Sequence, residues 1–418
     1  MIRIMQYLRQ KISAILFVLI LLALYAFAAV YGASDATNTV RSTETKHSTQ
    51  NDADLDPASA DDSDASQQEQ KSSVFEQPKQ VTIAAAGDIL LHTAVINSGK
   101  RNADGNGYDF TPNFAALTPI LSRADFAICQ METPISLDGK NIDGGAELVF
   151  NAPKEVLHAL KAAGYDSCSF ASNHTLDQGL SGISATEQAI RAAGLHFAGA
   201  SLQQSRAGAA EVIEVDGIRI GHLALTYTFP NSAAPTLQIP SAAPWLSAYS
   251  WPTQGAEGII KQAARAKREG ADFVVVSLHW GTEYQQAPTR EQQDLAQKLL
   301  ASDAVDLILG AHAHVIQPCQ QINGKHVLYG MGNAISNQSP QVVDWMKPSV
   351  QDGVVAEFTL TKNTDGKVTS TMQYYPTFVD LHGHVVRAVT PQTNPDSWAR
   401  TVSAIDALGG CNATPMAQ

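Results

Sequence analysis

The chain is poor in cysteine, and its cysteines are far apart. Its 418 residues include four of them, Cys129, Cys168, Cys319 and Cys411, and none has a Cys-x-x-Cys spacing. Neither a zinc ribbon nor a dithiol redox motif is therefore indicated. Cys129 and Cys168 lie in apolar stretches, where a cysteine is typically a plain core residue. Cys319 and Cys411 could pair if the domain is extracellular, which the sequence leaves open.

Positive charge is also scarce. The chain has 28 Lys and Arg against 40 Asp and Glu, a formal charge of -12. It has no basic stripe interleaved with aromatic residues, so no nucleic-acid partner is expected. An apolar content of 44% is normal for a globular protein. The length allows one large domain with appendages, or two ordinary domains.

One stretch near the N-terminus carries no charge at all. Residues 12–31 are rich in Leu, Ile, Ala and Val and are long enough to cross a bilayer as a helix. Arg3, Arg9 and Lys11 precede this stretch, which predicts a cytoplasmic N-terminus and an extracytoplasmic remainder. A cleaved signal peptide is the alternative, because small residues occur at 26–28. We expect an uncleaved, single-pass anchor in the cell membrane.

Composition divides the chain into five parts. We predict a cytoplasmic tail at 1–11, a transmembrane anchor at 12–31, a disordered acidic linker at 32–80, a folded domain at 81–390 and a C-terminal tail at 391–418. The linker is acidic and has almost no large apolar side chains, so it cannot bury enough surface to offset the entropy of ordering.

The folded domain alternates strand-like and helix-like segments. Apolar runs at 81–86, 125–129, 166–171, 273–278 and 305–309 predict strands, and helices are expected at 111–122, 153–163, 181–193, 256–269 and 290–301. Turn dipeptides at 216–217, 323–324 and 365–366 predict hairpins, and 229–253 reads as a long loop that could be a lid. Parallel units joined to hairpins predict a mixed α/β fold, a four-layer α-β-β-α sandwich of two mixed sheets.

Polar residues of the kinds that bind metals follow five of the predicted strands. They are Asp88, Glu132, Asn173 with His174, His279, and His312 with His314. His312 and His314 are two residues apart, so in an extended chain both side chains leave the same side of the backbone. Because ligands bind at the carboxyl edge of such sheets, these residues predict a divalent-metal site. Solvated loop histidines are the alternative for the His-x-His pair taken alone.

The same segments carry a resemblance to a known family. The series Ala86-Gly-Asp88, Gln130-Met-Glu-Thr-Pro134, Ser172-Asn-His-Thr-Leu-Asp177, Ser277-Leu-His-Trp-Gly281, Gly310-Ala-His-Ala-His-Val315 and Tyr329-Gly-Met-Gly-Asn333 resembles the CapA family. That family is associated with poly-γ-glutamate capsule synthesis and has a calcineurin-like metallophosphoesterase fold. The resemblance extends over about residues 81–380.

The resemblance implies a role for each matching residue. Asp88 and His314 would hold one divalent ion, Asn173, His279 and His312 a second, and Glu132 would bridge them; Mn, Zn and Fe are the candidate metals. His174 would be catalytic, as a proton donor or phosphate ligand, and Asp177 and Asn333 would bind substrate. The sequence departs from the family pattern in that Leu90 stands where the superfamily usually keeps a histidine, Gln130 where Asn is common and Ala311 where His is common. His92 could supply the missing nitrogen, or could lie on a helix surface.

The remaining histidines and one tryptophan have simpler interpretations. His382 and His384 form a second His-x-His pair, but they follow the strand-helix alternation and are expected at the surface. Trp280 is expected to pack in the core rather than to recognise a ligand.

The resemblance thus implies a membrane-anchored, extracytoplasmic protein that serves synthesis or export of an anionic polymer of the poly-γ-glutamate type, with a divalent-metal hydrolase site at the strand ends as a hypothesis. One alternative is a surface metallophosphoesterase that acts on nucleotides or other phosphate esters. A second is a scaffold without turnover in a membrane polymer-synthase complex. The expected partners are the anionic polymer or phosphate-ester substrate, the membrane, and that complex.

Overall fold

The computed structural model describes residues 77–231 and 238–417. The predicted cytoplasmic tail, the anchor and nearly all of the linker lie outside these residues. Within the described ranges, no helix combines the length and apolar character that a membrane span requires. The first described strand, β1, begins at Lys79, two residues before the predicted start of the domain.

The first sheet has nine strands and contains the first parallel segments of the chain. Its strands are β1 (Lys79–Ile89), β2 (Phe126–Met131), β6 (Ser167–Phe170), β7 (His196–Gly199), β14 (Asn333–Ile335), β15 (Asp352–Lys362), β16 (Val368–Asp380), β17 (Val385–Ala388) and β18 (Ala413–Pro415). Their order is β17-β16-β15-β1-β2-β6-β7, with β14 beside β1 and β18 beside β16. The strands β1, β2, β6 and β7 are parallel, whereas each pair in the series β1-β15-β16-β17 is antiparallel.

The second sheet has six strands in the order β12-β13-β11-β10-β9-β8. These are β8 (Glu211–Val215), β9 (Ile218–Thr226), β10 (Phe273–His279), β11 (Leu307–Ala311), β12 (Ile316–Ile322) and β13 (Lys325–Met331). The four central strands are parallel, and a hairpin lies at each edge. A small third sheet contains β3 (Ile135–Ser136), β4 (Asp143–Gly144) and β5 (Phe150–Pro153). The prediction of a mixed α/β fold with mixed sheets is confirmed.

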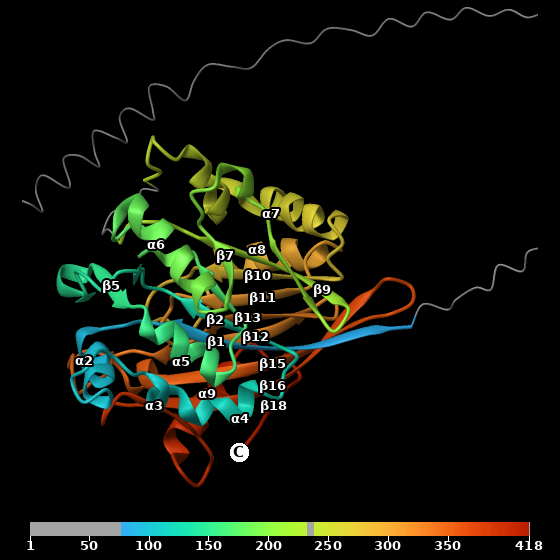
Figure 1. The fold of residues 1–418 in the computed structure, drawn as a ribbon. Coiled ribbons are helices and arrows are strands. Elements are labelled where there is room, and N and C mark those ends of the chain that lie inside the picture. The colour runs from blue at the N-terminus through green and yellow to red at the C-terminus, as the bar shows by residue number, and fades with distance from the viewer. Residues whose placement is uncertain (1–76, 232–237, 418) are drawn as a thin grey trace, which may run out of the picture. The chain divides into compact units, whose positions relative to one another are not determined.

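The helices are α2 (Thr93–Asn102), α3 (Thr111–Phe114), α4 (Thr118–Leu121), α5 (Glu155–Ala163), α6 (Gly179–Ala192), α7 (Trp251–Arg268), α8 (Arg290–Ala301) and α9 (Pro395–Ile405), with short 3-10 turns η1 (Ala115–Leu117), η2 (Ala146–Leu148), η3 (Gln204–Arg206), η4 (Pro244–Tyr249) and η5 (Pro348–Gln351). Helices α2 to α8 cover the outer faces of the two sheets, whereas α9 packs against the cluster between the sheets and contacts strands of both (Figure 1).

Three apolar clusters hold these layers together. One lies between the nine-stranded sheet and helices α2 to α6, and another between the six-stranded sheet and helices α7 and α8. The third lies between the sheets, where side chains such as Ile83, Ile128, Val275 and Leu309 meet. Alternate residues of one strand point to opposite faces, so β1 supplies Ile83 to the cluster between the sheets and Ala84 to the helix-covered face.

Several predicted boundaries differ from the structure. The helix expected at 111–122 is broken into α3, η1 and α4, because Pro119 has no amide hydrogen and cannot continue a helix. The helix that follows begins at Glu155 rather than at Pro153, which belongs to β5. The C-terminal segment predicted as a tail contains α9 and β18, both of which pack on the domain.

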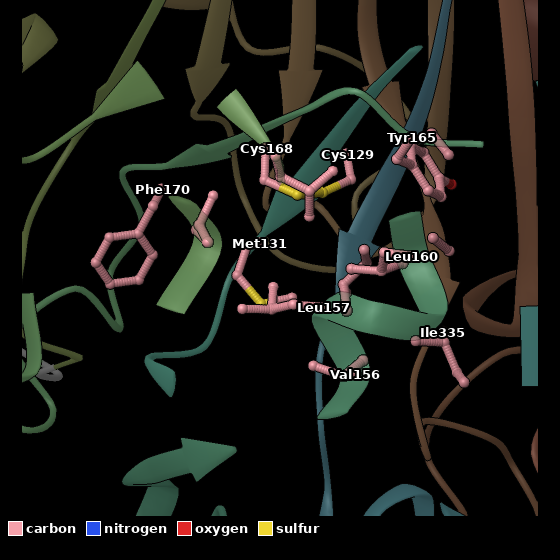
Figure 2. Packing of buried hydrophobic residues seen from close by; sticks show 14 of the residues in the cluster. Cys129, Met131, Val156, Leu157, Leu160, Tyr165, Cys168, Phe170 and Ile335 are labelled. Carbon is pink, nitrogen blue, oxygen red and sulfur yellow. A yellow bond between two sulfur atoms is a disulfide. The ribbon is translucent and has the colours of Figure 1, made fainter. Parts of the chain in front are cut away.

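All four cysteines are paired. Cys129 and Cys168 are opposite each other on the adjacent strands β2 and β6 and form a disulfide, which Figure 2 shows among Met131, Leu157 and other buried side chains. The interpretation of these two as plain core residues was wrong: both are buried, but they are bonded. The register of two distant strands decides this, and the sequence does not show it. Cys319 and Cys411 form the second disulfide, which ties β12 to the C-terminal segment.

A buried histidine joins the two sheets and should make the fold sensitive to acid. His222 of β9 lies 3.1 Å from Ser167 Oγ of β6 and 2.9 Å from Ser277 Oγ of β10. Burial lowers the pKa of His222 from 6.5 to about 4. The unfolded chain therefore binds an extra proton between these pH values, and stability falls as the pH falls through that window.

We expect the unfolding free energy to fall by about 3 kcal/mol as the pH falls through this range, since one unit of pKa difference corresponds to about 1.4 kcal/mol. Urea unfolding at pH 7 and pH 4 measures the loss. His222→Gln has no titrating ring and should show a smaller loss over the same range. An equal loss in the variant would show that other groups cause it.

A candidate metal centre at the strand ends

The predicted metal-site residues come together at one edge of both sheets. Asp88 lies near the end of β1, and Glu132 and Asn173 follow the ends of β2 and β6 in the nine-stranded sheet. His279 ends β10, and His312 and His314 follow β11 in the six-stranded sheet. All six are at least 97% buried, so the segments that carry them are held tightly in the core.

One half of the cluster is built around His314. Its Nδ1 lies 3.3 Å from Asp88 Oδ2 and 3.1 Å from Asn333 Oδ1. Its Nε2 lies 3.7 Å from Glu132 Oε1. The backbone N–H of His312 also donates to Asp88 Oδ2, at 3.1 Å. Asp88, Glu132 and His314 each offer a ligand atom within 4.8 Å of the others, a separation that one cation could bridge.

The other half is built around His279. Its Nε2 lies 2.8 Å from Asn173 Oδ1 and 3.6 Å from the same Glu132 Oε1. The ring of His312 lies with its centroid 4.7 Å from that of His279, and Glu132, His279 and His312 form a second group of ligand atoms within 4.8 Å. Glu132 belongs to both groups, which is the position that a bridging carboxylate requires.

Unpaired polar atoms test whether a cation fits here. Asp88 Oδ1, both carboxylate oxygens of Glu132 and His312 Nδ1 are buried and have no hydrogen-bond partner among the described residues. A buried polar atom without a partner costs about 1–3 kcal/mol, more when it is charged, and is uncommon in folded proteins. Carboxylate oxygen and imidazole nitrogen together suit Mn, Zn or Fe, so the residues fit divalent cations.

Burial and the charges of neighbouring side chains set the protonation states in this cluster. Burial, and next the charge of neighbouring histidines, hold the pKa of His279 and His312 well below the usual range. Both rings are therefore neutral, the state in which imidazole binds a metal. Burial raises the pKa of Glu132. Burial alone would lower the pKa of His314, but Glu132 and Asp88 outweigh it and raise the pKa to about 10.

Two close approaches of the backbone bring the strand ends together. A Cβ on Gly87 would lie 1.9 Å from the carbonyl oxygen of Gly332, and a Cβ on Gly310 would lie 1.9 Å from that of Tyr329. Only glycine fits at these points, directly before Asp88 and two residues before His312.

The backbone of both histidines after β11 is in the left-handed region, with φ of 93° at His312 and 55° at His314. Such strain is uncommon outside glycine and clusters at functional sites. In the presence of a chelator we expect His312→Gly to be about 1 kcal/mol more stable than His312→Ala, because glycine adopts this φ without strain. Thermal unfolding of the two variants measures the difference.

The matched control is His279, whose φ is not positive. There the order should reverse, with His279→Ala more stable than His279→Gly, because glycine in a strand loses more conformational entropy. If alanine were the more stable replacement at position 312 as well as at position 279, strain at His312 would be refuted.

His174 is held beside the cluster rather than in it. Its Nδ1 lies 2.8 Å from Asp177 Oδ2, an oxygen that also accepts the backbone N–H of Phe150. The edge of the His174 ring contacts Phe150 at a centroid distance of 4.7 Å. Nε2 makes no hydrogen bond with any described residue, so it is the ring nitrogen left for another molecule.

The two residues predicted to bind substrate both hold an imidazole in place. Asp177 fixes His174 as described. Asn333 is fully buried, and its amide donates to Gln338 Oε1 and to the carbonyl oxygen of Val350 while its Oδ1 faces His314. Asn333 has no exposed surface for a substrate, so its position is that of a support for His314.

Four further residues complete the surroundings, and sequence reasoning missed them. The rings of Tyr227 and Tyr284 lie 4.6 Å from His312 and 6.0 Å from His314. Gln130 Nε2 lies 3.5 Å from His279 Nδ1, and Asn231 accepts the amide of Asn173. Of these four, only Gln130 could have been found from the sequence, since it lies in the segment Gln130-Met-Glu-Thr-Pro134 that resembles the family. The other three lie in loops without a recognisable spacing.

The other interpretations are partly confirmed. His382 is exposed as expected, but His384 is buried and its Nε2 lies 2.8 Å from Asn337 Oδ1, because its loop folds onto the N-terminal helices. His92 occupies the N-cap position of α2 beside the cluster without a side-chain capping hydrogen bond, and its Nδ1 accepts the N–H of Asn337. Trp280 is buried and donates to the carbonyl oxygen of Tyr329, a packing role. The expected lid at 229–253 contains η4 and the start of α7, and residues 232–237 are outside the described ranges.

Comparison with known proteins gives a consistent picture. The family described as "Bacterial capsule synthesis protein PGA_cap" matches residues 82–338. The chain is 27% identical to the capsule biosynthesis protein CapA of Bacillus anthracis over 290 residues, which are 68% of this chain and 65% of the relative. It is also 27% identical to the PGA biosynthesis protein CapA of Bacillus subtilis over 271 residues, 64% of this chain and 65% of the relative. The matches thus span just under two thirds of each of these relatives.

Among solved structures, the chain is similar to the calcineurin-like phosphoesterase YfkN of Bacillus subtilis. The sequence identity is 16% and the TM-score 0.41, over 78% of this chain and 98% of that one.

Proposed function

The chain belongs to the PGA_cap family of bacterial capsule synthesis proteins, and from that premise we propose that it is a metal-dependent hydrolase in the synthesis or export of a poly-γ-glutamate-type polymer. One observation carries the proposal: a carboxylate with no hydrogen bond, Glu132, is shared by two groups of possible ligands at the meeting edge of two sheets. A buried carboxylate without a hydrogen-bond partner destabilises a fold, and a cation bound to Glu132 would remove that cost.

The residues that would hold the cations are Asp88 and His314 on one side, Asn173, His279 and His312 on the other, and Glu132 between them. Divalent cations bound there would supply Lewis acidity, which polarises a phosphoryl or an amide carbonyl oxygen. We take this arrangement to be metallophosphoesterase-like. Asn333 fixes the Nδ1 side of His314, and such support of a ligand typically affects metal affinity 10- to 100-fold.

His174 is the proposed proton donor. The Asp177 carboxylate accepts a hydrogen bond from Nδ1–H and fixes the orientation of the ring, so Nε2 is the nitrogen that would deliver a proton to the leaving group. Phe150 packs against the same ring and limits its rotation. The arrangement serves an alkoxide leaving a phosphate ester or an amine leaving a γ-glutamyl amide.

We propose an extracytoplasmic location for the domain, with residues 12–31 as the membrane anchor. The two disulfides support this, because structural disulfides persist in oxidising compartments and are rare in the cytoplasm. The positive residues before the apolar run support the same orientation.

The test is to measure bound metal and the hydrolysis of two substrates by the full-length chain. A γ-glutamyl oligomer and a generic phosphate ester are supplied with Mn²⁺ or Zn²⁺. Metal-dependent cleavage or transfer of the oligomer is the expected result. Turnover of the phosphate ester alone would favour a surface metallophosphoesterase, and a folded chain without metal or turnover would favour a scaffold in a polymer-synthase complex.

Asp177→Asn separates proton donation from metal binding. We expect kcat to fall about 100-fold or more, the usual contribution of a positioned general acid, because an amide can also donate to Nδ1 and no longer fixes the tautomer and orientation of the His174 ring. The metal content should stay at the wild-type value, since Asp177 is not among the proposed ligands. Loss of metal in this variant would contradict the assignment and make Asp177 part of the metal site.

A further inference from the structure

The C-terminal end of α2 carries two adjacent cations, Lys100 and Arg101. Lys100 and Arg101 are exposed, and neither forms an ion pair within the described residues. Together with Asn97, Asp104 and Gly105 they line a cavity of about 480 Å³. Two cations against one acidic residue make this hollow positive, in a chain whose formal charge is -12.

This hollow is structurally joined to the metal centre. His92 occupies the N-cap position of α2, beside the cluster. Arg101 follows nine residues later in the chain, which is about 14 Å along a helix at 1.5 Å per residue. His92 Nδ1 accepts the N–H of Asn337 at 3.2 Å, and Asn337 Oδ1 lies 2.8 Å from His384 Nε2. These two hydrogen bonds link the start of α2 to the 382–384 loop.

Hydrogen bonds hold the basic end of α2 in position. Asn102 at the end of α2 donates to Asn113 Oδ1, and Asn113 donates to the carbonyl oxygens of Gly383 and His384. His382 in the same loop is almost fully exposed. These contacts hold the end of α2 against the 382–384 loop.

We propose that the basic end of α2, formed by Lys100 and Arg101, is a binding subsite for an extended polyanion whose chain leads along α2 to the metal centre. The ligand class is a flexible chain with regularly spaced carboxylates, because Arg and Lys pair with carboxylates and the separation of about 14 Å exceeds the reach of a compact phosphate ester. The proposal rests on the proposed function and specifies how the polymer is held.

The test is binding of a defined-length γ-glutamyl oligomer to the full-length chain, measured by titration calorimetry at two salt concentrations. The variant K100E/R101E should bind the oligomer about tenfold more weakly and with a smaller salt dependence. Its metal content should match the wild type. Its unfolding midpoint should fall only slightly, because both side chains are exposed but lie in the last turn of α2, where positive charge favours the helix.

The matched control is R290E/K298E, which makes the same change of net charge at exposed positions on α8, in the helix layer of the other sheet. It should bind the oligomer as the wild type does. Equal binding by K100E/R101E and the wild type, or equal weakening in both double variants, would overturn the subsite and leave the proposed function intact. A wild-type chain that binds no oligomer at either salt concentration would overturn both.

Discussion

Glu132→Gln is expected to abolish metal binding and to lower any metal-dependent activity at least about 100-fold, while the metal-free protein stays folded. Both groups of candidate ligands include the Glu132 carboxylate, so a single substitution removes a ligand from each. Glutamine has nearly the same shape, which leaves the surrounding packing unchanged. It also removes the repulsion between two buried carboxylates, because Asp88 is a neighbour that raises the pKa of Glu132.

Thermal unfolding with and without Mn²⁺ measures this directly. A cation that binds only the folded wild type stabilises it by about 2.7 kcal/mol when its concentration is 100 times the Kd. Glu132→Gln should show no such shift. An exposed acid such as Glu291 supplies the control, since Glu291→Gln should keep the wild-type shift. A metal-induced shift in Glu132→Gln equal to that of the wild type would contradict the bridging role.

Gly310→Ala should destabilise the fold by about 3 kcal/mol, a large share of a typical total stability of about 5–15 kcal/mol. The new Cβ would meet the Tyr329 carbonyl oxygen at 1.9 Å and the Trp280 indole nitrogen at 2.6 Å. These two atoms are hydrogen-bonded to each other at 2.8 Å, so neither can move without breaking that bond. The displaced β11 would carry His312 and His314 out of place, so metal affinity should fall as well.

Gly221→Ala is the matched control for this overpacking. Gly221 lies in β9 of the same sheet, and its new Cβ would meet only side-chain carbons, the nearest at 3.2 Å. We expect a loss below about 1 kcal/mol and unchanged metal affinity. Urea unfolding measures both variants. Equal stability of Gly310→Ala and Gly221→Ala would show that β11 and β13 tolerate a wider separation than the structure has.

The sequence predicted the parts of this protein that depend on local pattern. The helix expected at 290–301 begins and ends as predicted, because Thr289 and Gln292 form a capping box before an amphipathic run. Apolar runs followed by metal-binding residue types located the site strands and the residues of the cluster. The hairpin turn at Asp216-Gly217 was also visible, since its two residues adopt the positive φ that the turn needs.

What the sequence did not reveal depends on contacts between distant segments. The disulfide between Cys129 and Cys168 follows from the register of β2 against β6. The strand β12 was missed because Gln317 and Pro318 interrupt its apolar pattern, although its neighbour β13 holds it in the sheet. Asn333 and His384 are likewise held by hydrogen bonds to Val350 and Asn337, which lie 17 and 47 residues away in the chain.

X-ray absorption of the full-length chain loaded with Mn²⁺ or Zn²⁺ tests the central claim most directly. Asp88, Glu132, Asn173, His279, His312 and His314 supply only oxygen and nitrogen, so the account predicts tightly bound metal with these two ligand types and an imidazole signature that weakens in His312→Ala. A chain that retains no metal after loading, or one whose spectrum shows sulfur ligands, would contradict it.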